Sequence, residues 1–132
     1  MLARLEDARV ARLATVDGAG RPRVVPICFA VAEGRLYTAV DQKPKRTERL
    51  ARLRDIEERR DAAVLVDHYV DADWSCLWWI RARGRARLLA SGAEAERALQ
   101  LLAAKYPQYR SAPPHGPVIE VALDELTGWQ AA

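Results

Sequence analysis

Two glycine-containing turns near the start of the chain constrain its fold more than any other feature. They lie at residues 17–20 and 33–34, and they separate three apolar runs at residues 10–16, 22–31 and 35–40. Glycine adopts the positive φ angles that tight hairpin turns require, so each turn reverses the chain between neighbouring strands. The pattern therefore predicts an antiparallel meander of three strands.

The rest of the chain alternates further strands with helices. Strands are expected at residues 62–69, 77–89 and 118–123, and helices at 2–9, 44–60 and 91–106, the last opened by a capping box at 91–94 and ended by Pro107. Pro26 cannot donate to a strand ladder, so it predicts an edge or a bulge in the second strand. Six strands with hairpin connections predict a mainly β fold, a six-stranded antiparallel β-barrel with flanking helices that occupies residues 1–132 as one domain. Side chains fill such a small barrel, so a large ligand would lie outside it, in a groove that a second subunit would close.

Composition narrows the classes of partner. The 132 residues include 21 Lys and Arg against 18 acidic residues, a net charge of +3, which does not call for nucleic acid. Cys28 and Cys76 form no C-x-x-C pair, so a zinc ribbon or thioredoxin-type site is not expected. Residues 1–7 lack the apolar run of a signal peptide, and no stretch reaches the length of a membrane span. We expect a cytoplasmic protein with no membrane segment.

Cations cluster where the third strand gives way to a helix. Lys43, Lys45 and Arg46 fall within residues 37–47, at this strand-to-helix junction. A helix N-terminus offers unpaired backbone N–H groups and a partial positive charge, and added cations would make the junction suited to a phosphate. The alternative is a solvated charge run at a surface turn, which the residues alone favour.

The strand at residues 77–89 carries a second candidate surface. Its alternation places Trp79, Arg81, Arg83, Arg85 and Arg87 on one face, and Trp78, Ile80, Ala82, Gly84, Ala86 and Leu88 on the other. Arginines beside a tryptophan suit a ligand with an aromatic ring and an anionic tail. The alternative is an outer barrel face open to water, with Trp78 filling the core.

No metal site or catalytic set can be assembled from the sequence. Asp67, His68, Asp71 and Asp73 fall near one strand end but have no recognised ligand spacing, so no metal is expected. The chain contains no nucleophile elbow, Walker loop or G-x-G-x-x-G turn, and no catalytic residue is assigned. This pattern is typical of a protein whose cofactor carries the reaction.

Short segments along nearly the whole chain resemble a known family. Residues 12–18 (RLATVDG) and 20–26 (GRPRVVP) are similar to the opening hairpin of the pyridoxamine 5'-phosphate oxidase-like split β-barrels, which bind FMN. Further similar segments are 36–38 (LYT), 43–45 (KPK), 65–69 (LVDHY), 73–75 (DWS), 77–81 (LWWIR), 105–109 (KYPQY) and 128–129 (GW). They match a subgroup that uses the deazaflavin coenzyme F420 in place of FMN.

The resemblance implies a homodimer with a cofactor at each end of the subunit interface. By position, Lys43 and Lys45 match the cations that hold the cofactor phosphate, and Thr38, Ala39 and Val40 match the strand along the ring system. Pro26, Ile27 and Cys28 match the segment near the reactive edge of the ring. Trp74, Trp79 and Arg81 are candidates for contributions from the facing subunit. Gln42 departs from the subgroup, where histidine is expected, and the departure would impair this chain if that histidine were catalytic.

The resemblance implies an F420-dependent oxidoreductase that transfers hydride between the reduced cofactor and a small unsaturated acceptor. Two other functions stay open on the sequence. The same fold could use FMN, as an oxidase or a flavin reductase, or the chain could be a non-catalytic module that holds a cofactor or an acidic partner. Nucleic-acid binding ranks last because the net charge is nearly balanced.

Overall fold

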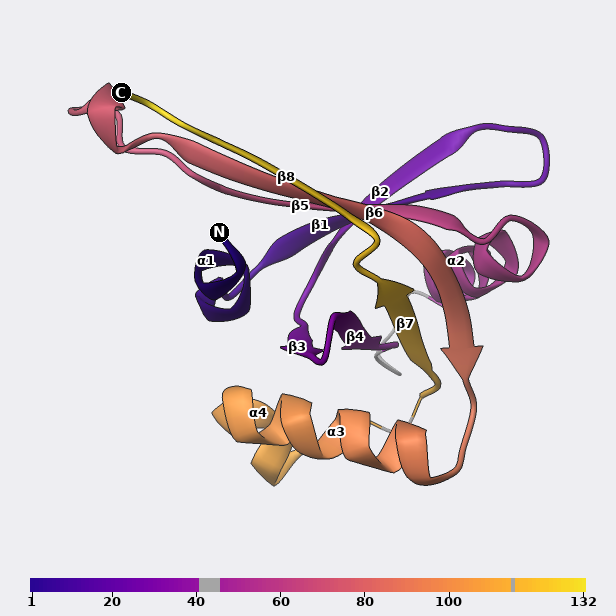
Figure 1. Cartoon of the computed structure of the whole chain (residues 1–132). Helices are drawn as coiled ribbons and strands as arrows, with labels where there is room; N and C mark the ends of the chain where they lie inside the picture. The colour runs from indigo at the N-terminus through magenta and orange to yellow at the C-terminus, as the bar shows by residue number, and fades with distance from the viewer. Residues whose placement is uncertain (41–45, 115) are drawn as a thin grey trace.

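A single curved antiparallel sheet forms the body of the molecule in the computed structural model (Figure 1). The structure describes residues 1–40, 46–114 and 116–132, without the side chains of residues 46–50. The strands in this part are β1 (Ala11–Val16), β2 (Pro22–Ile27), β3 (Ala30–Ala32), β4 (Arg35–Ala39), β5 (Asp61–His68), β6 (Trp78–Leu89), β7 (Val118–Ala122) and β8 (Glu125–Gln130). The helices are α1 (Leu2–Asp7), α2 (Arg46–Glu58), the 3-10 helix η1 (Trp74–Cys76), α3 (Ala93–Lys105) and α4 (Pro107–Ser111).

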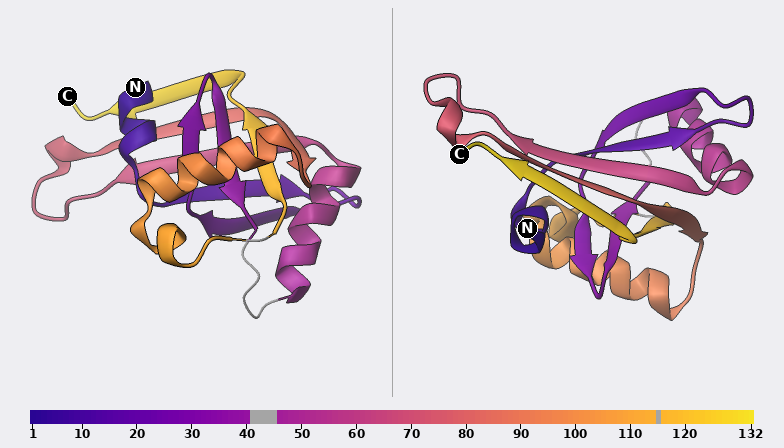
Figure 2. Two further views of the ribbon diagram at one scale, coloured as in Figure 1. Left: turned by 90° about the horizontal axis from the view of Figure 1, so that it is seen from below. Right: turned by 45° about the horizontal axis from the view of Figure 1, so that its top comes forward.

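The long strand β6 joins the two halves of the sheet. The strands run in the order β2-β1-β5-β6-β7-β4-β3, and β8 pairs with β6 beside this path. The first part of β6 pairs with β5 and β8, whereas Ala86–Leu89 pair with β7. The β5–β6 hairpin extends well beyond the body of the protein, with η1 between its strands (Figures 1 and 2). More buried and more exposed residues alternate along β2, β1, β5 and β6, so one side of these strands faces the core and the other side faces outward.

The mainly β architecture with flanking helices is confirmed, but the prediction of six strands is wrong: the described chain has eight. The expected strand at residues 22–31 divides at Cys28 and Phe29, because β2 pairs with β1 and β3 pairs with β4 in the other half of the sheet. The three-strand meander is thus two separate hairpins. β8 escaped prediction because nearly all of its residues are exposed, which removes the alternation that marks a strand.

The helices close the open sides of the sheet. α3 packs on β3, β4 and β7, and α4 follows it directly (Figures 1 and 2). The expected capping box is wrong, because Gly92 is the N-cap of α3 and makes no side-chain cap, while Glu94 forms an ion pair with Arg87. α2 is anchored through Asp55, a buried carboxylate that accepts hydrogen bonds from Thr15 (2.7 Å) and Arg23 (2.8 Å).

A second buried carboxylate, Glu120 on β7, ties β7 to its two neighbours. Arg35 of β4 and Arg87 of β6 pair with it at 2.9 and 2.8 Å, and only 2% of its side chain is exposed. Burial opposes ionisation of Glu120, but the hydrogen bonds from Arg87 and its charge outweigh burial and hold the pKa at about 2. The carboxyl group of Glu120 is therefore ionised at neutral pH in the folded protein.

We expect Glu120→Gln to lower the free energy of unfolding by about 2 kcal/mol at pH 7, because charged hydrogen bonds to a buried group are lost. A pKa lowered from 4.5 to about 2 stabilises the fold above pH 4.5, and this contribution disappears as the pH falls toward 2. Denaturant unfolding between pH 2 and 7 should therefore show less acid destabilisation in the variant. The matched control is Glu125→Gln, whose ion pair with Arg83 is exposed (63% and 60%) and should change the free energy by less than about 0.5 kcal/mol. Equal effects of the two variants would contradict the role given to Glu120.

Candidate functional site

The outward face of β2, β1, β5 and β6 collects residues from four strands into one row. Arg12 lies opposite Pro26 on one side and opposite Leu65 on the other, and Leu65 lies opposite Arg81. Residues directly opposite one another in an antiparallel sheet project from the same face. The register therefore places Pro26 and Arg81, both predicted site residues, on one surface, three strand spacings or about 14 Å apart.

This surface is hollowed, with a volume of about 520 Å³. Its walls include the apolar residues Ala14, Val24, Leu65 and Trp79 and the cations Arg12 and Arg81. The guanidinium of Arg81 lies 5.4 Å from the centre of the Trp79 ring, so the strand brings these two predicted residues together. An apolar hollow with a few convergent charged groups is the usual form of a small-molecule site.

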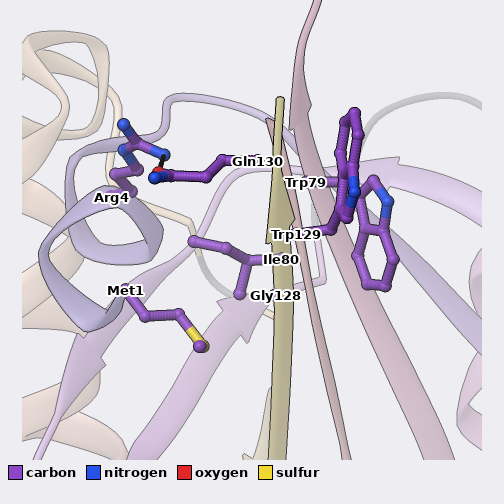
Figure 3. A pocket seen from close by; sticks show the side chains of 7 residues that line it. All are labelled: Met1, Arg4, Trp79, Ile80, Gly128, Trp129 and Gln130. Atoms are coloured by element: carbon purple, nitrogen blue, oxygen red, sulfur yellow. Dashed lines mark hydrogen bonds between the residues drawn. The ribbon is translucent and has the colours of Figure 1, made fainter. Parts of the chain in front are cut away.

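A second tryptophan, which was not among the predicted site residues, lies beside Trp79. Trp129 of β8 lies directly opposite Trp79 and is 49% exposed. Figure 3 shows the two indoles side by side on one side of the strands, whereas Met1 and Arg4 of the N-terminal segment lie on the other side. These residues line a crevice of about 460 Å³ beside β8. The paired indoles belong to the same outward face as the hollow.

The two segments expected along the cofactor ring meet each other in the structure. The Thr38 hydroxyl donates a hydrogen bond of 2.7 Å to the backbone oxygen of Cys28. Thr38, Ala39, Val40 and Ile27 are buried as whole residues, so these four residues offer a ligand almost no surface within one protomer. Pro26 is exposed and Cys28 is half-buried, which leaves these two side chains as the accessible part of the segment.

Trp74 lies away from this surface within one protomer, and other predicted residues fall outside the described part of the chain. Lys43 and Lys45 lie outside the described residues, as does Gln42, and their roles stay predictions. Trp74 starts η1 at the end of the β5–β6 hairpin and is 64% exposed. The hairpin thus separates Trp74 from Pro26 and Thr38.

The arginines that alternate along β6 have different partners in the structure. Arg87 binds the buried Glu120, and Arg83 pairs with Glu125 at 2.9 Å. Arg81 stays available on the outward face beside Trp79. The idea that the whole row follows an anionic tail is therefore not supported for Arg87, since its guanidinium already compensates a carboxylate in the protein.

The acidic loop after β5 has a structural use. Asp73 accepts hydrogen bonds from the backbone (3.0 Å) and the hydroxyl (2.6 Å) of Ser75, and Asp71 accepts one from Tyr69 (2.8 Å). The hydrogen bonds from Ser75 lower the pKa of Asp73. Within residues 1–40, 46–114 and 116–132 no cluster of three or more His, Cys, Asp or Glu residues could hold a metal ion.

Comparison with known proteins identifies the family. A family model described as pyridoxamine 5'-phosphate oxidase matches residues 1–130, and the chain belongs to this family. No curated protein matches the chain. No helix in the described part of the chain has the length and apolar character needed to cross a membrane.

Solved structures support the same fold. A FAD-binding protein from Mesorhizobium loti superposes with a TM-score of 0.73 at 19% identity, covering 99% of this chain and 92% of that chain. The conserved hypothetical protein Rv2991 from Mycobacterium tuberculosis gives 0.76 at 14%, with coverages of 98% and 84%. The FAD-binding protein from Mycobacterium smegmatis gives 0.65 at 17%, with 98% and 91%. At these identities the likeness shows the fold alone. The split-barrel family with flavin-binding neighbours is thereby confirmed, and the use of F420 stays a prediction.

Proposed function

We propose that the chain is a homodimeric oxidoreductase that binds the deazaflavin F420 and transfers hydride to a small unsaturated acceptor. The observation that carries the proposal is the row on the outward face, which puts Pro26, Arg12 and Arg81 on one surface beside an apolar hollow. Membership in the pyridoxamine 5'-phosphate oxidase family supports flavin-type redox chemistry.

The residues fit a cofactor with a planar ring and negative charges. Trp79, Leu65 and Val24 offer apolar area against which a ring can pack and from which water is excluded. Arg12 and Arg81 offer guanidinium groups suited to a carboxylate or phosphate of the anionic tail. When bound, a deazaflavin supplies two-electron hydride chemistry. The protein's tasks are then to bind the phosphate through Lys43 and Lys45, to orient the ring along residues 26–28 and 38–40, and to keep the reacting atoms dry.

A second copy of the chain is the proposed cover for the outward face. Val24 and Leu65 are 62% and 38% exposed on this face, and Trp129 of β8 is 49% exposed. Such exposed apolar area favours self-association over contact with solvent. Because Pro26 and Arg81 are separated by two intervening strands, one small ring cannot contact both within one protomer. A facing copy would bring its own Trp79 and Arg81 to the Pro26 segment, and Trp74 would extend the same contact.

The alternative with specific support is FMN or FAD in the same site, because two structural neighbours are described as FAD-binding proteins. Gln42, which departs from the histidine of the F420 subgroup, also weakens the case for a fully active F420 enzyme. These cofactors share an aromatic ring and a phosphate, so the described surface accommodates either choice.

A side-by-side titration of F420, FMN and FAD tests the proposal. We expect F420 to bind at least about ten times more tightly than the other two, with one cofactor per chain and a sedimentation coefficient of a dimer. Tighter binding of FMN or FAD would show that the protein uses a flavin instead of F420. A monomer that binds none of the three would overturn the proposal. A dimer that binds F420 but shows no turnover with a panel of unsaturated acceptors would instead be a non-catalytic module.

A further inference from the structure

The bend between β2 and β3 is held by side chains from distant parts of the chain. β2 ends at Ile27 and β3 begins at Ala30, so Cys28 and Phe29 lie between two strands and outside the ladders of both. Backbone groups that leave a ladder inside a protein need other partners. Three of the four polar backbone groups of this pair find such partners in hydroxyl side chains.

Tyr106, at the junction of α3 and α4, supplies most of these partners. Its hydroxyl accepts a hydrogen bond from the Phe29 N–H at 3.1 Å. The Phe29 carbonyl (3.1 Å) and the Arg9 carbonyl (2.9 Å) share its single proton. From the other side, the Thr38 hydroxyl binds the Cys28 carbonyl at 2.7 Å. Burial raises the pKa of Tyr106, which keeps the hydroxyl protonated as this arrangement requires.

Lys105 also contacts the bend, through the side chain of Phe29. Its ammonium lies 3.9 Å from the centre of the Phe29 ring, and its Nζ is buried with no hydrogen-bond acceptor within the described residues. Burial, aided by the charge of Arg9, lowers its pKa to about 8. Such an ammonium contributes little to stability, since desolvation offsets its attraction to the ring. Its contact with Phe29 does, however, restrict the ring that Tyr106 already fixes through the backbone.

We propose that Tyr106 is a positioning residue, whose hydroxyl clamps both backbone groups of Phe29 and thereby fixes the Pro26–Cys28 segment against the bound cofactor. The proposal rests on the function proposed above for the cofactor contact, whereas the clamp itself is a property of the chain alone. The α3–α4 junction does not line the outward face. The proposal nevertheless gives this junction a role in positioning the residues of the site.

The clamp can be tested without any cofactor, through the reactivity of Cys28. The chain has only two cysteines, so in a Cys76→Ser background Cys28 is the single thiol. Tyr106→Phe retains the ring but loses the hydroxyl, and we expect Cys28 to react with a maleimide about 10-fold faster, because lost hydrogen bonds favour local opening. Two controls accompany it. Tyr69→Phe loses an exposed hydroxyl bonded to Asp71, and Glu120→Gln destabilises the packing of β7 without removing a hydrogen bond of Cys28 or Phe29. Neither should change the labelling rate.

Two further measurements complete the test. In the unmutated chain, the Phe29 amide should exchange with solvent as slowly as amides of the neighbouring strands, although no strand binds it. In Tyr106→Phe, the Kd for the cofactor that the unmutated chain binds best should rise about 10-fold, while Glu120→Gln leaves it unchanged. Unaltered labelling or rapid Phe29 exchange would overturn the clamp. Faster labelling with an unaltered Kd would overturn its role at the site. If the unmutated chain binds no cofactor, the proposed function and the positioning role both fall, while labelling and exchange still decide the clamp.

Discussion

Replacing Lys45 with alanine is expected to raise the Kd for the cofactor about 10- to 100-fold. Charged hydrogen bonds are worth about 1.5–3 kcal/mol, and each 1.4 kcal/mol changes the affinity tenfold. Lys45 immediately precedes α2 in the sequence, and the unpaired backbone N–H groups and partial charge of a helix N-terminus also favour an anion. The proposed phosphate contact therefore combines the charge of the lysine with the partial charge of the helix end. Lys43→Ala should also raise the Kd, by a smaller factor.

The measurement is a fluorescence or calorimetric titration of F420 at two salt concentrations. Arg97→Gln is the matched control, because Arg97 lies on α3, away from the site, and carries the same charge in an exposed ion pair with Glu33. Its Kd should stay within about twofold of the unmutated value. Near-native affinity of Lys45→Ala would reject the phosphate role of the lysine pair and, with it, the main reason to prefer a nucleotide-type cofactor.

The sequence was informative where side chains alternate at short range. The alternation placed Ile80, Ala82 and Ala86 on one face of β6, and the structure buries all three, because successive side chains of a strand point to opposite faces of the sheet. The same reasoning failed for β8 and for the break at Cys28. β8 lacks a buried face, and the break depends on the hydroxyls of Thr38 and Tyr106, which are 10 and 77 residues away from their backbone partners.

The candidate site shows the same limit more clearly. Trp79 and Arg81 were predicted because they alternate on one strand, but Arg12 and Leu65 were missed. Their part in the hollow depends on the register of β1 with β2 and β5, which is set by turns and packing over the whole sheet. A family resemblance supplied Pro26 and Cys28, and only the register revealed that Pro26 shares a face with Arg81.

The second large effect is expected from Arg81, which the proposal assigns to a site built by two protomers. Arg81→Ala should weaken cofactor binding about 10-fold or more, because the outward face loses a guanidinium that packs beside Trp79. If each cofactor contacts Lys45 of one protomer and Arg81 of the other, the two single variants damage opposite halves of the same site. The variants can therefore be made to complement each other.

Mixing unfolded Lys45→Ala and Arg81→Ala chains and refolding them together should restore tight binding at about one site in four. Half of the dimers would be hybrids, and a two-fold symmetric hybrid has one site with both defects and one with neither. The control mixture of Lys45→Ala with Lys43→Ala should restore nothing, since both changes fall in the same half and every hybrid site retains one of them. A site contained within a single protomer also predicts no recovery in the first mixture. Recovery in the first mixture alone would therefore establish that two copies build each site, and its absence would show that Arg81 does not complete the site of the facing protomer.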